Sequence, residues 1–162
     1  MKNPKNKGNT FERKIANLLS ERFKQWTGLD KSFRRNADSG SYFGGINESR
    51  LRTHGTEKAN LGDIICPDDF QFTIECKHYK TPPGINALMS QSITEWDNWI
   101  AQAQQDSKNS GKNFLLIIRY NRVNEFVITN LDINTNIKYK GFSILQLSEL
   151  LNNSDQVFFE KK

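Results

Sequence analysis

The first part of the chain carries apolar residues at helical spacing. The positions that recur every three or four residues are Phe11, Ile15, Leu18, Leu19, Phe23 and Trp26. This spacing predicts an amphipathic helix that starts near Thr10, with Asn9 as its N-cap and Gly28 just beyond its end. Residues 1–8 contain no apolar anchor, so we expect them to be disordered.

Two short strands are predicted in the middle of the chain. Residues 62–66 form an apolar, β-branched run, and Pro-Asp-Asp at 67–69 indicates a turn. Over residues 70–77, apolar and polar side chains alternate. In the second strand, Phe72, Ile74 and Cys76 would point to one face, and Gln71, Thr73, Glu75 and Lys77 to the other. If the two strands pair antiparallel, Asp63 lies within reach of Glu75 and Lys77.

The rest of the chain alternates between predicted loops, helices and strands. Residues 44–61 have no periodicity and suggest a mobile loop that orders on binding, or plain disorder. A helix is predicted over 86–109, a strand buried on both faces over 114–118, and another strand over 124–129. Residues 143–151 predict an amphipathic helix whose apolar side is either core or a dimer face.

Length and composition fit one intracellular domain covering residues 1–162. The mean hydropathy is −0.70, but the aromatic content of 11% argues against general disorder. No apolar run is long enough to cross a bilayer and no signal peptide is evident, so we expect a cytoplasmic protein with no membrane partner. The two cysteines, Cys66 and Cys76, lie in predicted strands and are expected to be reduced, with a disulfide as the alternative if the two strands align. No Cys/His cluster has zinc spacing.

Positive charge is concentrated near the N-terminus. The net charge is +5, and residues 1–36 contain ten lysines and arginines against three acidic residues. A basic third next to an acidic cluster suits a protein that attracts a polyanion such as DNA. The alternative is a solvated basic tail.

Candidate chemistry lies in the two middle strands. Asp63 and Glu75 beside Lys77, on strands with an apolar opposite face, form a costly arrangement unless a cation or a substrate compensates it. Few carboxylate oxygens with a nearby cationic group suit a Mg²⁺ site for phosphodiester hydrolysis. The alternative for Glu75 and Lys77 alone is a solvated surface ion pair.

These residues also resemble a known signature. Gly62-Asp63 followed by Glu75-Cys76-Lys77 is similar to the metal-binding motif of the PD-(D/E)XK nuclease superfamily, with glycine where the name has proline. The sequence around Glu12, from Gly8 to Arg13, is similar to the first helix of the Holliday junction resolvases in that superfamily. In those enzymes the helix glutamate completes the metal site, although a capping-box role for Glu12 remains the alternative.

The resemblance implies a fold and a metal site. It implies an α/β fold in which a mixed central β-sheet is flanked by α-helices, the restriction-endonuclease-like core with the order αβββαβ. It implies that Glu12, Asp63, Glu75 and the backbone carbonyl of Cys76 bind Mg²⁺, for which Mn²⁺ could substitute. Lys77 would orient the attacking water or stabilise developing negative charge.

DNA contacts are expected from a set of basic and polar residues. Arg35 and Ser39 are the nearest matches to the arginine-then-Ser-Gly segment of archaeal-type resolvases, with Arg34 and Ser41 as alternatives. Gln91 or Gln102 could reach the metal-bound phosphate. The full set of predicted DNA-binding residues is Arg34, Arg35, Ser39, Ser41, Arg50, Arg52, Lys58, His78, Lys80 and Gln102.

The sequence therefore predicts a Mg²⁺-dependent DNA endonuclease. The first expectation is a homodimeric Holliday junction resolvase of archaeal or phage type that acts on branched DNA. The second is a restriction-type or repair endonuclease that acts on duplex DNA. The third is a nuclease-derived DNA-binding module without activity.

Overall fold

A mixed five-stranded sheet lies at the centre of the protein. The computed structural model describes residues 4–37 and 61–160. The sheet order is β3-β4-β5-β7-β6, with the bounds Phe72–Tyr79, Asn113–Tyr120, Phe126–Thr129, Phe142–Gln146 and Lys138–Tyr139. β3 and β4 are parallel, and the other neighbours are antiparallel. The predicted mixed sheet flanked by helices is confirmed, as expected for a restriction-endonuclease-like core.

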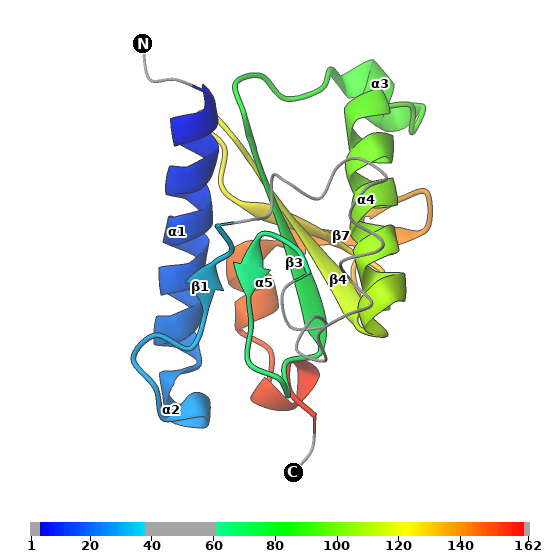
Figure 1. Cartoon of the computed structure of the whole chain (residues 1–162). Coiled ribbons are helices and arrows are strands. Elements are labelled where there is room, and N and C mark those ends of the chain that lie inside the picture. The colour runs from blue at the N-terminus through cyan, green and yellow to red at the C-terminus, as the bar shows by residue number, and fades with distance from the viewer. Residues whose placement is uncertain (1–3, 38–60, 161–162) are drawn as a thin grey trace.

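Helices cover both faces of this sheet. Helix α1 (Pro4–Arg22) packs on one side and α4 (Thr94–Ser110) on the other, as Figure 1 shows. The strands supply alternate residues to the two sides: Leu115 and Ile117 face α1, while Leu116 and Ile118 face α4. β4 is therefore buried on both faces, which confirms the prediction for residues 114–118.

The first helix begins earlier than its apolar stripe. The prediction that residues 1–8 are disordered is wrong for residues 4–8, which belong to α1. Pro4 suits the first position of a helix because its missing N–H has no intrahelical partner there. Asn9 is consequently not an N-cap, and Glu12 lies inside the helix, so its capping-box alternative is wrong as well. A short helix, α2 (Lys24–Thr27), follows α1 and ends at Gly28.

The two predicted middle strands do not pair with each other. β2 (Ile64–Ile65) instead pairs antiparallel with β1 (Arg34–Arg35), and β3 joins the main sheet through β4. The predicted antiparallel pairing of these two strands is therefore wrong, although the chain still turns between β2 and β3. Asp63 remains attached to β3 because its backbone N–H donates to the Ile74 carbonyl at 2.7 Å.

Two predicted helices have different extents. The predicted helix over 86–109 is divided into α3 (Ile85–Met89) and α4, because Gln91 adopts φ 50° between them. The predicted helix over 143–151 is wrong in its first half. Residues 142–146 form β7, which pairs with β5, and only Leu147–Leu151 forms α5. Pairing with β5 outweighs the helical pattern because it completes the sheet.

The end of the described chain packs into the hydrophobic core on the α1 side of the sheet. A 3₁₀ turn at Asp155–Val157 leads to Phe158 and Phe159, which are fully buried with Phe23 and Phe70. Both cysteines are free thiols, as predicted. Over the described residues, no helix has the length and apolarity that a membrane span requires.

Candidate active site

The candidate site lies along the outer edge of β3. β3 is the end strand of the sheet, so only one of its edges is occupied by β4. On the other edge, the Cys76 backbone N–H donates to Asp63 Oδ2 at 2.8 Å. Because the N–H and C=O of one residue leave a strand on the same side, the Cys76 carbonyl is also on this edge. The edge thus holds the Asp63 carboxylate and the Cys76 carbonyl together.

Gly62 makes this attachment possible. It adopts φ 84°, and a Cβ at this position would lie 2.6 Å from the Ile74 carbonyl oxygen. Any side chain would push Asp63 away from β3. Proline, which the superfamily name has here, is excluded because its ring fixes φ near −65°. The departure from the named motif is therefore required by the local backbone.

Glu75 and Lys77 project from β3 toward α4. Glu75 is 3% exposed, and Lys77 Nζ lies 3.4 Å from Glu75 Oε2. Gln102 of α4 joins them: its Oε1 accepts from Lys77 Nζ at 3.1 Å and its Nε2 donates to Glu75 Oε2 at 3.0 Å. The carboxylate and the ammonium are thus held by one carboxamide.

Glu12 approaches the same region from α1. It is 9% exposed, and its Oε2 accepts from Arg35 Nε at 2.6 Å. Arg35 also donates from Nη2 to Asn9 Oδ1 at 2.8 Å, so two residues of α1 hold its guanidinium. β1 brings Arg35 here because it pairs with Ile64, the residue after Asp63.

The carboxylates of the site influence one another's ionisation. Burial, and then the Asp63 charge, raises the pKa of Glu75 well above its usual range, while Lys77 opposes the shift. Burial and the Asp63 charge also raise the pKa of Glu12, against the lowering effect of Arg35 and Lys77. Burial and the neighbouring Asp63 carboxylate therefore disfavour the charged forms of Glu12 and Glu75 in the metal-free protein.

The types of donor suit a hard divalent cation, although the described side chains are not gathered into a complete site. Three carboxylates and one backbone carbonyl are the kinds of oxygen ligand that Mg²⁺ and Mn²⁺ favour. Each carboxylate also has a protein partner: Arg35 for Glu12, the Cys76 N–H for Asp63, and Gln102 for Glu75. Over residues 4–37 and 61–160, no three His, Cys, Asp or Glu side chains are grouped closely enough to hold an ion.

Asp106 is a neighbour of the site that the sequence interpretation did not include. It lies one helical turn after Gln102 on α4 and is partly buried. Burial raises its pKa, and Glu75, Asp63 and Lys77 all interact with it. The four-residue spacing from Gln102 would have found it once Gln102 was placed against Glu75.

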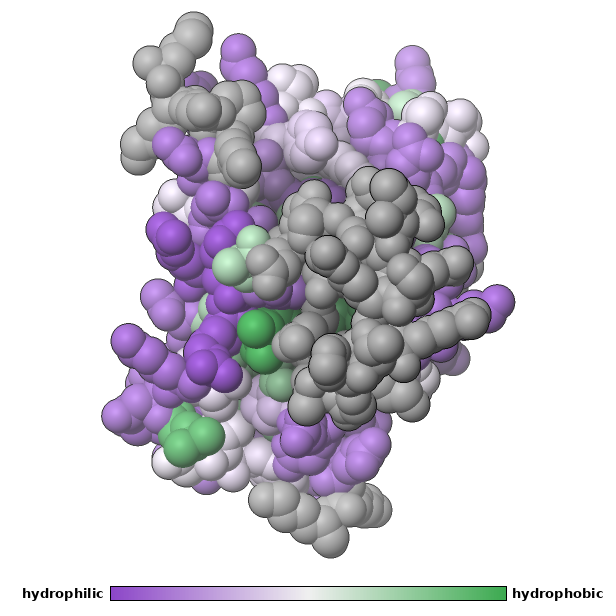
Figure 2. Space-filling model, viewed as in Figure 1, coloured by the Kyte–Doolittle hydropathy of each residue, from purple (hydrophilic) through white to green (hydrophobic). Residues whose placement is uncertain are grey.

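The other predicted DNA-binding residues are in different places. Arg34 and Lys80 are exposed, whereas His78 turns to the α1 side of the sheet, where its ring centroid lies 5.3 Å from that of Phe11. Figure 2 shows hydrophilic side chains over much of α1 on the viewed face, and Arg13 and Lys14 are among its exposed residues. The remaining predicted residues, Ser39, Ser41, Arg50, Arg52 and Lys58, lie outside the described residues.

Comparison with known proteins gives one match. The family model described as "Phage putative PDDEXK endonuclease" matches residues 3–156, which is nearly the whole chain. No curated protein and no solved structure matches the chain.

Proposed function

Because the chain belongs to this PDDEXK endonuclease family of phages, we propose that it hydrolyses phosphodiester bonds in DNA with the help of a divalent metal ion. The observation that carries the proposal is the attachment of Asp63 to the Cys76 N–H, at 2.8 Å, on the strand that bears Glu75 and Lys77. This contact brings the separate halves of the motif to one strand edge.

Asp63, Glu75, Glu12 and the Cys76 carbonyl would hold the metal. When bound, Mg²⁺ polarises the phosphate and lowers the pKa of an attacking water. Binding there would favour the ionised form of Glu75, whose pKa is raised first by burial and then by the Asp63 charge.

Lys77 supplies a fixed positive charge next to these carboxylates. Its Nζ contacts both Glu75 and Gln102, and its side chain is 19% exposed. A lysine held in this way can orient the attacking water or stabilise negative charge that develops on the phosphate.

We propose branched DNA as the substrate and a homodimer as the active form. The support is the resemblance of the Gly8–Arg13 segment to the first helix of Holliday junction resolvases. The surplus of basic residues over 1–36 also fits a polyanionic partner. A dimer would place two sites across one junction and make paired nicks.

Cutting assays on matched substrates test this function. A labelled four-way junction and a linear duplex of the same arm sequence are incubated with the protein and Mg²⁺ or Mn²⁺. We expect strong preference for the junction. Preference for the duplex would favour a restriction-type or repair endonuclease, and binding without cutting on either substrate would favour an inactive DNA-binding module.

Two variants test whether cutting depends on the candidate site. Glu75→Ala and Lys77→Ala should abolish cutting and leave junction binding largely intact, because phosphate contacts from basic residues supply most of the affinity. Loss of binding in parallel with loss of cutting would show that Glu75 and Lys77 are a structural pair.

A further inference from the structure

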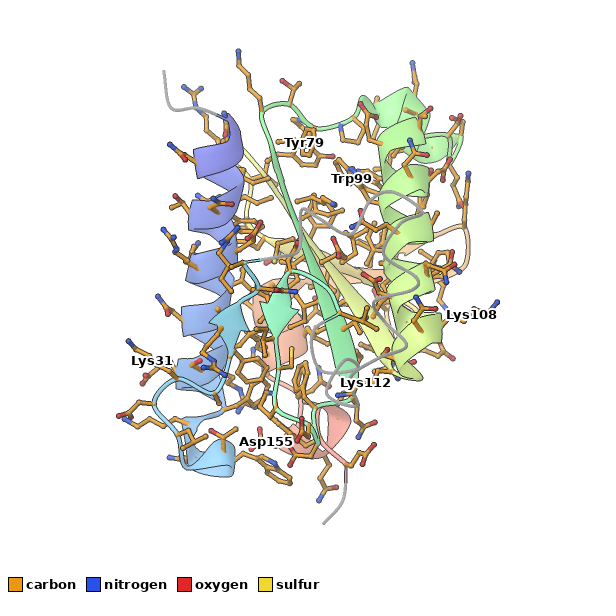
Figure 3. The ribbon with its side chains drawn as sticks, in the orientation of Figure 1. Lys31, Tyr79, Trp99, Lys108, Lys112 and Asp155 are labelled. Carbon is orange, nitrogen blue, oxygen red and sulfur yellow. The ribbon has the colours of Figure 1, made fainter. Side chains whose placement is uncertain are left out.

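An aromatic pair lies directly beyond the catalytic residues on β3. Glu75, Lys77 and Tyr79 occupy alternate positions of this strand, so all three side chains leave it on the same face. The Tyr79 ring packs against Trp99 of α4, with ring centroids 4.7 Å apart and an interplanar angle of 41°. Figure 3 shows the two side chains pointing toward each other from the end of β3 and from α4.

The two rings differ in exposure. Trp99 is 7% exposed and belongs to the core under α4, whereas Tyr79 is 48% exposed. Within residues 4–37 and 61–160, Tyr79 is the one exposed aromatic side chain. Its ring is therefore supported by a rigid neighbour and still offers much of its surface to a ligand.

Two lysines lie close to Tyr79 along the chain. Lys77 precedes it by two residues, about 7 Å along a strand, and the exposed Lys80 follows it directly. Lysines near an exposed, supported aromatic ring are a combination that single-stranded nucleic acid binds, through its phosphates and its base faces. A base in an intact stack cannot offer its face to such a ring, so the ligand must be unpaired or at a strand end.

From this arrangement we propose that Tyr79, supported by Trp99, is a stacking site for an unpaired nucleobase of the DNA substrate next to the phosphate that is cut. This proposal rests on the proposed function and makes it more specific. It predicts that the enzyme acts where bases are unpaired, as at a branch point, a flap or a gap. Stacking would recognise the unpaired base without reading its sequence, because every base has an aromatic face.

Binding of single strands without metal tests the stacking site apart from catalysis. The probes are an oligothymidylate strand and an abasic strand of the same length and charge, with EDTA present. The variants are Tyr79→Leu, which removes the aromatic ring, and Tyr79→Phe, which keeps it. Thermal unfolding of each variant establishes that it is folded.

We expect Tyr79→Leu to bind oligothymidylate about five- to tenfold more weakly than the unmodified protein. Its affinity for the abasic strand should not change, and Tyr79→Phe should retain most of the affinity for both strands. Tryptophan fluorescence should respond to oligothymidylate and not to the abasic strand, because the base would stack on the ring that contacts Trp99.

Two results would overturn the stacking site. One is an unchanged affinity of Tyr79→Leu for oligothymidylate, and the other is an equal loss on both strands, which would assign Tyr79 to backbone contact. In either case the nuclease function stands if the protein still cuts DNA. Failure of the unmodified protein to bind or cut any DNA would overturn both proposals.

Discussion

Gln102 Nε2 donates a hydrogen bond to Glu75 Oε2 at 3.0 Å, and this contact joins α4 to the edge strand of the sheet. The same carboxamide accepts from Lys77 through Oε1, so its two ends contact groups of opposite charge. A glutamine can satisfy both at once because its carboxamide has a donor and an acceptor. Gln102 therefore orients Glu75 and Lys77, in addition to any contact with a phosphate.

Removal of this carboxamide should slow the cutting step. We expect Gln102→Ala to lower the single-turnover cleavage rate by about 10- to 100-fold, since residues that orient metal ligands have effects of this size. DNA affinity measured without metal should change little. Gln105→Ala is the matched control, because Gln105 is exposed on the same helix and donates to Asn109. Equal effects of the two substitutions would contradict the positioning role.

Gly62 should be irreplaceable for steric reasons. Gly62→Ala places a Cβ 2.6 Å from the Ile74 carbonyl oxygen at φ 84°. We expect a loss of about 2 kcal/mol or more in the free energy of unfolding, together with loss of cutting as Asp63 moves from Cys76. Gly84→Ala is the control, with φ −67° and no atom within 4 Å of the added Cβ. Denaturant unfolding of both variants decides the point, and equal stabilities would refute it.

The ion pair between Arg35 and Glu12 should contribute to stability. Their side chains are 20% and 11% exposed, so solvent screens the pair only partly. We expect Arg35→Ala to cost about 1–3 kcal/mol, because it leaves a buried carboxylate without its cation. In a Glu12→Gln background the same substitution should cost much less. A double-mutant cycle on unfolding free energies measures the difference, and additive effects would show that the pair does not interact.

Glu75 should make the metal-free protein less stable as pH rises. Its pKa is raised in the folded state, so above about pH 4.3, the ordinary glutamate value, the folded protein holds more protons than the unfolded chain. The stabilising contribution of protonated Glu75 is complete at low pH and is lost as pH rises through the raised pKa. Glu75→Gln should therefore raise the melting temperature near pH 7.5 and have little benefit near pH 4.

Melting temperatures across this pH range, with EDTA present, provide the measurement. A Glu75→Gln effect that is independent of pH would contradict the assignment of the raised pKa to Glu75. Glu125→Gln serves as the control, because ion pairs with Lys14 and Arg119 lower the pKa of Glu125. That substitution should destabilise the protein most at neutral pH.

The sequence predicted the sheet and the nuclease motif because both leave local signals. Continuous apolar residues identify β4, and alternation places Glu75 and Lys77 on one face. The pairing of β2 with β1 left no such signal, because β1 contributes only Arg34 and Arg35 from a distant part of the chain. β7 was interpreted as helix since its apolar residues fit both periods, and only pairing with β5 decides between them.

The contacts at the candidate site divide in the same way, into those with a local sequence signal and those without one. Asp63, Glu75 and Lys77 could be found by motif, and Glu12 by resemblance. The role of Gln102 as a bridge, the nearness of Asp106 and the support of Tyr79 by Trp99 depend on how α4 packs on β3. The helical pattern of α4 fixes which residues face inward, but it does not fix their register along the strand.

Binding of Mn²⁺ tests the central claim most directly, because it requires neither a chosen substrate nor turnover. The measurement is a titration of the metal-free protein followed by electron paramagnetic resonance, alongside Asp63→Asn and Glu75→Ala. We predict saturable binding to the unmodified protein and strongly weakened binding to both variants, since each loses an oxygen ligand or its charge. Absence of binding to the unmodified protein, or equal binding to Asp63→Asn, would contradict a metal site at the edge of β3.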